Sequence, residues 1–365
     1  MTQPQTASSD ARALLRLLRG NPWPNRLVLA PMTNKQSHPD GTLSEDELHW
    51  LSRRAEGGFG VVMTCAAHVS HAGQAWIGQM AAWDDRFVPG LRQIPEAVSR
   101  HGRRSILQLY HGGRRAKSVV SGEPTLAPWA DARTGSRRMT IEEIRKAVDA
   151  FAAAARRAQD AGFDGVEVHA AHGYLIEQFL DSSRNARVDE FGGDFEGRAR
   201  FLRAVVERIR TLTDPDFQVG VRLSPEGEGI VLEESQGLAA SMMASGLIDF
   251  LDLSLWDSFK YPRDTRFAER PLLEQFTDLP RHGVRVGVAG KIYSGAAVQE
   301  CLDRGADFVV VGTAAIVHHD FANRVMADPG FVSVAHPVSR DHYRQEGLNE
   351  TFIDYLSNEW DDFVI

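Results

Sequence analysis

The sequence predicts a single (β/α)8 barrel over residues 1–365, and three observations support this fold class. Apolar runs with β-type composition alternate with amphipathic helical stretches from residue 26 to residue 312. Several runs are continuous in Val, Ile and Leu, which is typical of parallel strands buried on both faces. No break in composition divides the alternation, so one barrel accommodates all of it. A doubly wound six-stranded sheet is the alternative, and it would leave strands unused.

Eight strands are predicted, each at a short apolar run. They are Arg26–Ala30, Gly60–Thr64, Ser105–Tyr110, Gly165–His169, Gln218–Leu223, Phe250–Ser254, Val284–Ala289 and Asp307–Gly312. Helices are predicted between them at Glu45–Glu56, Pro89–Arg100, Ile141–Ala161, Glu196–Leu212, Glu233–Ala244, Leu272–Leu279 and Gly295–Arg304. Thr140 and Glu143 have the spacing of a capping box. Glycines that predict helix C-termini follow at Gly57, Gly102, Gly162, Gly246 and Gly305.

Two segments fall outside the alternation. Residues 112–139, after the third strand, are rich in Gly, Arg, Ser and Pro, and we expect an insertion that folds over the mouth of the active site. Arg114 and Arg115 open this insertion, where a solvated role is favoured. The tail at residues 330–365 is expected to pack on the barrel or on a second subunit.

Composition excludes several classes of function. A net charge of −8 argues against partners such as nucleic acid or an anionic membrane. The two cysteines, Cys65 and Cys301, allow no disulfide framework and no iron–sulfur cluster. Residues Met1 to Asp10 lack the apolar core of a signal peptide, and no apolar run reaches the length of a membrane span. These features predict a cytoplasmic enzyme, with a homodimer as the commonest oligomer for a soluble protein.

Polar residues gather where the predicted strands end, which is where barrel enzymes place their active sites. The segments are Ala30-Pro-Met-Thr33, Thr64-Cys-Ala-Ala67, Gln108-Leu-Tyr-His111, His169-Ala-Ala-His172-Gly-Tyr174, Arg222-Leu-Ser-Pro225, Ala289-Gly-Lys291 and Gly312-Thr313. The fourth segment is the most informative, because its imidazoles can donate hydrogen bonds to a substrate oxygen and its phenol can deliver a proton.

The order of these segments across residues 25–325, together with Asn185-Ala-Arg187-Val-Asp189-Glu-Phe191-Gly192-Gly193, resembles the Old Yellow Enzyme family. Members of this family are FMN-dependent ene-reductases built on a (β/α)8 barrel. The resemblance implies FMN as cofactor and NAD(P)H as co-substrate. It implies a small-molecule activated alkene, either an α,β-unsaturated carbonyl or a nitroalkene, as the molecule reduced. Asn185, Arg187 and Asp189 are expected to have structural roles in a loop.

The resemblance also implies a set of FMN-binding residues. Pro31, Met32 and Thr33 would lie along the flavin ring, with the Thr33 hydroxyl near flavin O4. Ala66 would make a backbone contact to the ring, Gln108 would bind the pyrimidine edge, and Arg222 would lie beside flavin N1 and O2. The positions that would surround the phosphate are Gly290, Lys291, Gly312 and Thr313.

For the reaction, the resemblance implies that His169 and His172 bind the oxygen of the electron-withdrawing group. Tyr174 would protonate the α-carbon, while the β-carbon receives hydride from flavin N5. Tyr110 would line the substrate site. NAD(P)H would reduce the flavin first in the same pocket, which gives ping-pong turnover.

The chain departs from the family at the phosphate. Many members have Arg where this chain has Thr313, and a neutral residue where it has Lys291. We therefore hypothesise that Lys291 supplies the cation that the missing Arg would provide. The family also has Tyr where this chain has Phe191 and often Pro where it has Ser182, and neither difference touches the expected chemistry.

Two other functions are compatible with the residues. The His-x-x-His spacing of His169 and His172 also occurs in metal-dependent barrel hydrolases and lyases, although no matching carboxylate–His set is evident at the other strand ends. A non-catalytic flavin-binding protein is the third possibility.

Overall fold

The computed structural model describes residues 10–365, so most of the N-terminal segment judged for a signal peptide lies outside the described residues. Eight parallel strands form a closed barrel, as the sequence predicts. Their bounds are β1 (Leu27–Leu29), β2 (Val61–Met63), β4 (Arg104–Tyr110), β7 (Gly165–Ala170), β8 (Gln218–Leu223), β9 (Phe250–Ser254), β10 (Arg285–Ala289) and β11 (Phe308–Val311). Each pairs with its neighbour along this order, and pairing of β11 with β1 closes the ring.

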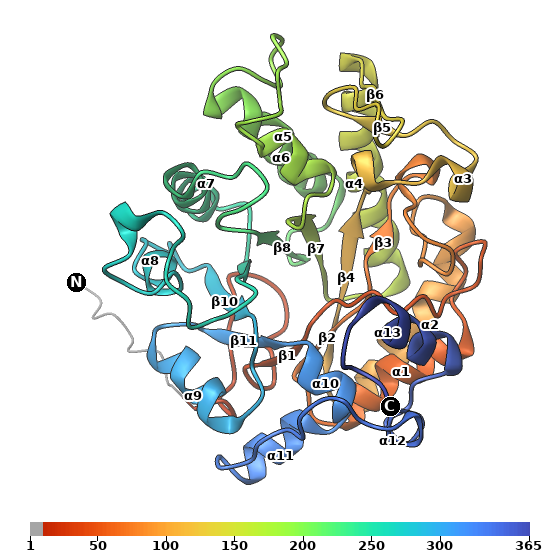
Figure 1. Cartoon of the computed structure of the whole chain (residues 1–365), viewed down its shortest axis with the longest axis vertical. Helices are drawn as coiled ribbons and strands as arrows, with labels where there is room; N and C mark the ends of the chain where they lie inside the picture. The colour runs from red at the N-terminus through yellow and green to blue at the C-terminus, as the bar shows by residue number, and fades with distance from the viewer. Residues whose placement is uncertain (1–9) are drawn as a thin grey trace.

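Helices lie outside the strands and pack on one another around the barrel (Figure 1). They are α1 (Glu45–Glu56), α2 (Val88–Ser99), α4 (Ile141–Ala161), α6 (Phe195–Leu212), α7 (Leu232–Ala244), α8 (Glu274–Thr277) and α9 (Gly295–Asp303). The predicted Leu272–Leu279 helix is wrong in length, because the Leu272 amide donates to the Lys260 carbonyl instead of joining the helix.

Helix α4 shows how local sequence sets its two ends. The Thr140 side chain accepts from the Glu143 amide, and the Glu143 side chain accepts from the Thr140 amide, which confirms the capping box. Gly162 ends the helix at φ 95°, a conformation that favours glycine. At the end of α1, by contrast, Gly57 has φ −67° and Gly58 takes the left-handed conformation at φ 98°. Gly57 is needed for space, because a Cβ there would lie 1.9 Å from the His319 carbonyl oxygen.

The barrel interior has two layers. The lower layer is apolar, and the Trp23 ring packs edge-on against Phe250 and Phe308 at centroid distances of 5.2 and 5.0 Å. Gly220 on β8 and Gly287 on β10 leave room for these two rings. The upper layer, nearer the carboxyl ends of the strands, contains buried polar side chains from β4, β7, β8 and β9. They are Gln108, Glu167, His169, Arg222, Asp252 and Ser254.

The insertion at residues 112–139 has structure of its own. It contains α3 (Ser118–Ser121), β5 (Leu126–Ala127) and β6 (Arg137–Arg138), and β5 pairs with β6. Buried Arg187 donates to the Pro128 and Met139 carbonyls at 3.1 and 2.8 Å. The structural interpretation of the Asn185–Asp189 segment agrees with these contacts, since Arg187 fastens the far end of the insertion to the barrel.

Short elements that the sequence did not predict complete the chain. They are β3 (Ala67–His68), α5 (Leu175–Leu180), α10 (Thr313–Val317), α11 (Phe321–Ala327), α12 (Arg340–Gln345) and α13 (Glu350–Glu359). Helix α13, in dark blue, lies against α1 in Figure 1, where the Phe352 and Trp50 rings are 5.0 Å apart. The tail therefore packs on the barrel.

We propose a single domain, because one apolar cluster includes residues from Leu27 in β1 to Phe363 near the end of the tail. Within residues 10–365, no helix has both the length and the apolar composition that a membrane crossing requires. The cytoplasmic location and the homodimer stay predictions.

The interior packing gives a stability prediction. Gly220→Ala places a Cβ 2.0 Å from the Phe250 ring, which is enclosed in the apolar layer. We expect the free energy of unfolding, measured by urea titration, to fall by about 1–3 kcal/mol. Gly237→Ala in α7 is the matched control, since its Cβ meets the Phe195 ring at 4.0 Å and alanine favours the helix. A Gly220→Ala protein as stable as the wild type would contradict this account of the interior.

Candidate active site

The residues expected to bind substrate lie together at the carboxyl end of β7. The ring centroids of His169 and His172 are 5.0 Å apart, and those of His169 and Tyr174 are 5.1 Å apart. Tyr110, from the end of β4, packs edge-on against Tyr174 at 4.5 Å. The structure thus brings two imidazoles and two phenols to one place.

The turn after β7 has an unusual backbone. His172 and Gly173 both lie in the left-handed region, at φ 60° and 70°. Contacts from four sides fix this conformation: the Ser224 hydroxyl accepts from the His172 amide at 3.1 Å, and Arg115 donates to the His172 carbonyl at 2.8 Å. Gln178 donates to the Gly173 carbonyl at 2.7 Å, and the Glu177 carboxyl accepts from the Gly173 amide. A non-glycine residue with such a φ persists only where its surroundings hold it.

Arg115 is exposed to solvent, which agrees with the predicted solvated role, but it also makes defined contacts to the turn. Besides its bond to His172, its guanidinium lies 5.4 Å from the centre of the Tyr174 ring. Its place at the start of a long insertion gave no signal for this contact, because the partner is a backbone carbonyl on another loop.

Both histidines are neutral near pH 7. Burial lowers the pKa of His169 well below its usual value, and neighbouring His172 and Arg222 lower it further. Burial, followed by the charges of Arg222 and Arg115, lowers the pKa of His172 to about 3. The His172 Nε2 atom lies 2.7 Å from the Ser254 hydroxyl, which orients the ring. Neutral imidazoles of this kind can donate a hydrogen bond without giving up a proton.

The expected flavin-ring residues lie at the ends of neighbouring strands. Pro31, Met32 and Thr33 follow β1 and are all partly accessible. Met32 lies beside the end of β11, since a Cβ on Gly312 would be 3.5 Å from the Met32 sulfur. Ala66 follows β2, and its carbonyl already accepts from Gln79 at 2.9 Å.

Gln108 and Arg222, expected at the pyrimidine edge, are buried and each contacts an acid. Gln108 Nε2 donates to Glu167 Oε1 at 2.7 Å. Arg222 Nε forms an ion pair with Asp252 Oδ2 at 3.2 Å, and another Arg222 nitrogen donates to the Ser254 hydroxyl at 3.4 Å. Glu167 and Asp252 were not predicted as site residues. A carboxyl group within the run Val166-Glu-Val168 is the signal that could have revealed the first of them.

The residues expected at the phosphate lie at the ends of paired strands β10 and β11. Gly290 has φ 149°, and a Cβ there would lie 2.7 Å from the Asp257 amide nitrogen, so this position requires glycine. Thr313 begins α10 directly after Gly312. Lys291 is 63% exposed and its Nζ lies 3.3 Å from Asp257 Oδ2, so its charge is already paired with a carboxylate.

The donor set of this site fits a large polar ligand such as FMN. Across the described residues 10–365, buried polar atoms without a hydrogen-bond partner include three at this end of the barrel. They are Tyr110 Oη, Trp76 Nε1 and His169 Nδ1. A cation beside an amide suits the pyrimidine of a flavin, and the accessible Pro31–Thr33 segment suits the face of its ring.

A metal-dependent site is not favoured at His169 and His172. Among the residues that the structure describes, the groups with metal-ligand geometry join the loop between α10 and α11 to Glu346 in the tail: His318 with His342, and His319 with Asp320. The His169–His172 pair has no third ligand of this kind.

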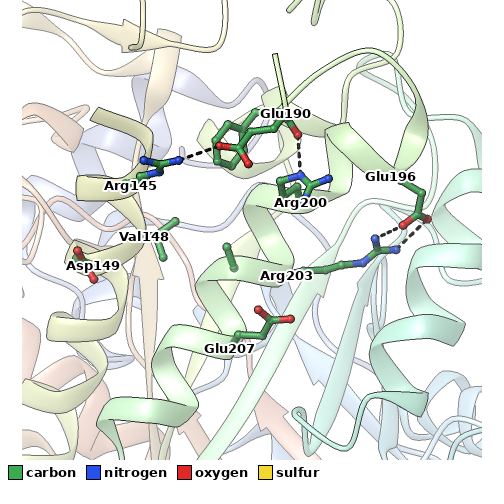
Figure 2. A pocket seen from close by; sticks show the side chains of 10 residues that line it. Arg145, Val148, Asp149, Glu190, Glu196, Arg200, Arg203 and Glu207 are labelled. Atoms are coloured by element: carbon green, nitrogen blue, oxygen red, sulfur yellow. Dashed lines mark hydrogen bonds and ion pairs between the residues drawn. The ribbon is translucent and has the colours of Figure 1, made fainter. Parts of the chain in front are cut away.

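A surface pocket between α4 and α6 is a separate feature, and Figure 2 shows that its charged residues are mostly paired. Arg145 bonds to Glu190 at 3.1 Å, and Arg203 pairs with Glu196. This pocket lies on the helices outside the barrel and contains none of the predicted site residues.

Comparison with known proteins identifies the family. Residues 22–328 match the NADH:flavin oxidoreductase / NADH oxidase family. The "probable NADH-dependent flavin oxidoreductase YqiG" of Bacillus subtilis is 33% identical over 312 residues, which cover 82% of this chain and 83% of that protein. An NADPH dehydrogenase of Bacillus pumilus is 32% identical over 81% of this chain and 88% of that protein. The "NADH:fumarate oxidoreductase" of Klebsiella pneumoniae is 33% identical over 85% of this chain, but the match spans only 35% of that longer protein.

The solved structures agree with the sequence relatives. An Old Yellow Enzyme homologue from Zymomonas mobilis superposes with a TM-score of 0.79 and 27% identity, covering 94% of this chain and 99% of that one. Morphinone reductase in complex with tetrahydroNAD superposes with a TM-score of 0.77 and 27% identity, covering 92% of this chain and 94% of that one. The chain therefore belongs to the NADH:flavin oxidoreductase / NADH oxidase family, the Old Yellow Enzyme family, with FMN as its cofactor and NAD(P)H as its co-substrate.

Proposed function

We propose that the protein reduces the C=C bond of a small activated alkene, such as an α,β-unsaturated carbonyl or a nitroalkene. The observation that carries the proposal is the grouping of His169, His172 and Tyr174, with Arg222 opposite His169 on the next strand. Two relatives are named NADH:fumarate oxidoreductase and NADH:acrylate oxidoreductase, after unsaturated acids, which supports this substrate class.

The histidines bind the electron-withdrawing group of the alkene. His169 and His172 are neutral, so each can offer an N–H to the substrate oxygen. Such a hydrogen bond strengthens as negative charge develops on that oxygen, which lowers the barrier to reduction. Ser254 and the turn contacts to Ser224 and Arg115 hold the His172 ring and backbone in place for this task.

Tyr174 supplies the proton. Its phenol lies within ring contact of His169, so it is placed beside an oxygen bound by the histidines. A phenol O–H can give its proton to a strongly basic carbanion. Tyr110 is fully buried, and burial raises the pKa of its phenol, which disfavours Tyr110 as the acid.

FMN, reduced by NAD(P)H, supplies the hydride when bound. Gln108 and Arg222 would hold its pyrimidine edge, Pro31 to Thr33 and Ala66 its ring, and the Gly290–Lys291 and Gly312–Thr313 pairs its phosphate. The fixed cation of Arg222 favours the negatively charged reduced form of the cofactor.

Half-reaction kinetics on the purified holoenzyme test the function. Under anaerobic conditions NAD(P)H should bleach the flavin, and an enone such as cyclohexenone should restore its colour. Reduction by NAD(P)H without reoxidation by any enone, nitroalkene or maleimide would leave a flavin-binding protein without this activity and would refute the proposal.

Removing a histidine should weaken alkene binding and slow alkene reduction. We expect His169→Ala and His172→Ala to lower the rate of reoxidation by an enone by about 10²–10³, while FMN is retained. Because alanine is strained at φ 60°, His172→Asn is the matched variant: asparagine tolerates this backbone and keeps a donor, so it should recover part of the lost rate. Unchanged enone kinetics in all three variants would contradict the assigned roles.

Tyr174→Phe removes the proposed proton donor and keeps the aromatic ring, so it tests the role of the hydroxyl group alone. The variant should be reduced by NAD(P)H at close to the wild-type rate but reoxidised by enones much more slowly, since only the second half-reaction needs the phenolic proton. Stopped-flow absorbance measures each half-reaction. Equal slowing of both would assign Tyr174 a packing role instead.

Lys291 is proposed as the cation for the FMN phosphate, in competition with Asp257. Lys291→Ala should then weaken FMN binding at least about tenfold, a loss of about 1.4 kcal/mol. Asp257→Asn removes the competing carboxylate and should strengthen binding. Fluorescence titration of the apoprotein with FMN measures both. If Lys291→Ala binds FMN as tightly as the wild type, another group neutralises the phosphate.

A further inference from the structure

Four buried side chains form a continuous chain of contacts across the upper layer of the barrel. It starts at Gln108 on β4, passes through Glu167 on β7 and Asp252 on β9, and ends at Arg222 on β8. All four are nearly or fully buried, and the two acids are completely inaccessible to solvent. Below them lies the apolar layer with Phe250 and Phe308, so water cannot solvate the acids from that side.

The contact between Glu167 and Asp252 requires a proton. Both carboxyl groups are completely buried and within hydrogen-bonding reach of each other, and one guanidinium, that of Arg222, offsets their charge. Two ionised carboxylates have only acceptors and would leave one buried negative charge without compensation. Within residues 10–365, the other donors that contact the pair are the Gln108 amide at Glu167 Oε1 and the Arg222 guanidinium at Asp252 Oδ2. One carboxyl group must therefore carry a proton and donate it to the other.

The neighbours indicate that Glu167 holds this proton. Asp252 lies 3.2 Å from the Arg222 guanidinium, which favours its ionised form, whereas Glu167 contacts a neutral amide. Burial first, and then the charge of Asp252, raises the pKa of Glu167 above its usual value. Around the pair, β4 contributes neutral Gln108, β7 contributes neutral His169, and β8 contributes the positive charge of Arg222.

We propose that Glu167 and Asp252 share one proton and act as positioning residues for FMN. Their single negative charge offsets Arg222, and the Glu167 oxygen fixes one N–H of Gln108 so that the rest of the amide faces the cofactor. The inference rests on the proposed placement of Gln108 and Arg222 at the flavin pyrimidine. The reduction potential of the bound FMN then depends on the proton that Glu167 and Asp252 share below the flavin site.

Two isosteric substitutions separate charge from packing. Asp252→Asn removes the negative charge beside Arg222, so the uncompensated cation should favour reduced FMN and raise its midpoint potential. We expect at least a tenfold shift in the reduction equilibrium, which is about 30 mV for two electrons. Glu167→Gln replaces a protonated carboxyl by an amide of the same shape and charge. Its potential at neutral pH should move by well under half of the Asp252→Asn shift.

Asp249→Asn is the matched control. Asp249 is also buried but precedes β9 at the opposite end of the strand, where it pairs with Arg19 and Arg210. Its loss should leave the midpoint potential of FMN unchanged. A shift as large as that of Asp252→Asn would show a general effect of lost charge and would overturn the proposal.

Infrared spectroscopy of the holoenzyme detects the shared proton directly. Burial also raises the pKa of Glu47 and Glu177, so the measurement is the difference between wild type and Glu167→Gln. We expect a band of a protonated carboxyl group that shifts in deuterium oxide and is missing from the variant. Absence of this band from the difference, or an unchanged potential in Asp252→Asn, refutes the proposal.

Neither measurement needs an alkene, so both remain decisive if the proposed substrate class is wrong. If Asp252→Asn does not fold, the infrared difference alone decides whether the proton is shared.

Discussion

The buried charge of Arg222 is the constraint on which the upper half of the barrel depends. A guanidinium keeps its charge in a protein, and removing it from water costs several kcal/mol unless a partner compensates. Asp252 is that partner on the neighbouring strand, and Ser254 accepts one further bond. Because Asp252 is itself buried, its carboxylate also needs a hydrogen-bond donor, and the protonated carboxyl group of Glu167 provides one. Arg222, Asp252 and Glu167 thus each satisfy the charge or the hydrogen bonding of a buried neighbour.

The barrel geometry makes such a layer possible. Arg222 faces His169 and Asp252 across the strand register, so alternate inward positions on β7, β8 and β9 fall in one plane. The apolar layer beneath is equally dependent on register, since Gly220 and Gly287 must stand beside the rings of Phe250 and Phe308. A large aromatic ring on one strand and a glycine on the next fill the narrow interior without a cavity. The closed lower layer then holds the polar layer at the open end.

The sequence predicted the elements that its local pattern determines. The capped helices Glu45–Glu56 and Ile141–Ala161 agree with the structure to the residue, as do strands Gln218–Leu223 and Phe250–Ser254. The other six strands differ from the prediction by one residue at one or both ends. Short elements such as β3 and α5 were missed, because two to six residues contain no measurable period and tertiary contacts hold them. The grouping of His169, His172, Tyr174 and Tyr110 followed from barrel topology, which brings strand ends together. The contacts of Arg115 and Asp257 could not be predicted, since they join loops whose paths no local pattern determines.

The chemistry of the site follows from how one cation acts on several neighbours. Burial lowers the pKa of both His169 and His172, and Arg222 adds to this effect, so the group that would stabilise negative charge on the cofactor also favours neutral imidazoles. A neutral imidazole polarises a carbonyl without protonating it, which keeps the oxygen available as a stable hydrogen-bond acceptor during reduction. The proton would then come from another group and reach carbon, and the Tyr174 phenol is the adjacent O–H donor that we propose for this step. The proposed separation of roles between the histidines and the tyrosine therefore follows from the burial of the imidazoles, to which the charge of Arg222 adds.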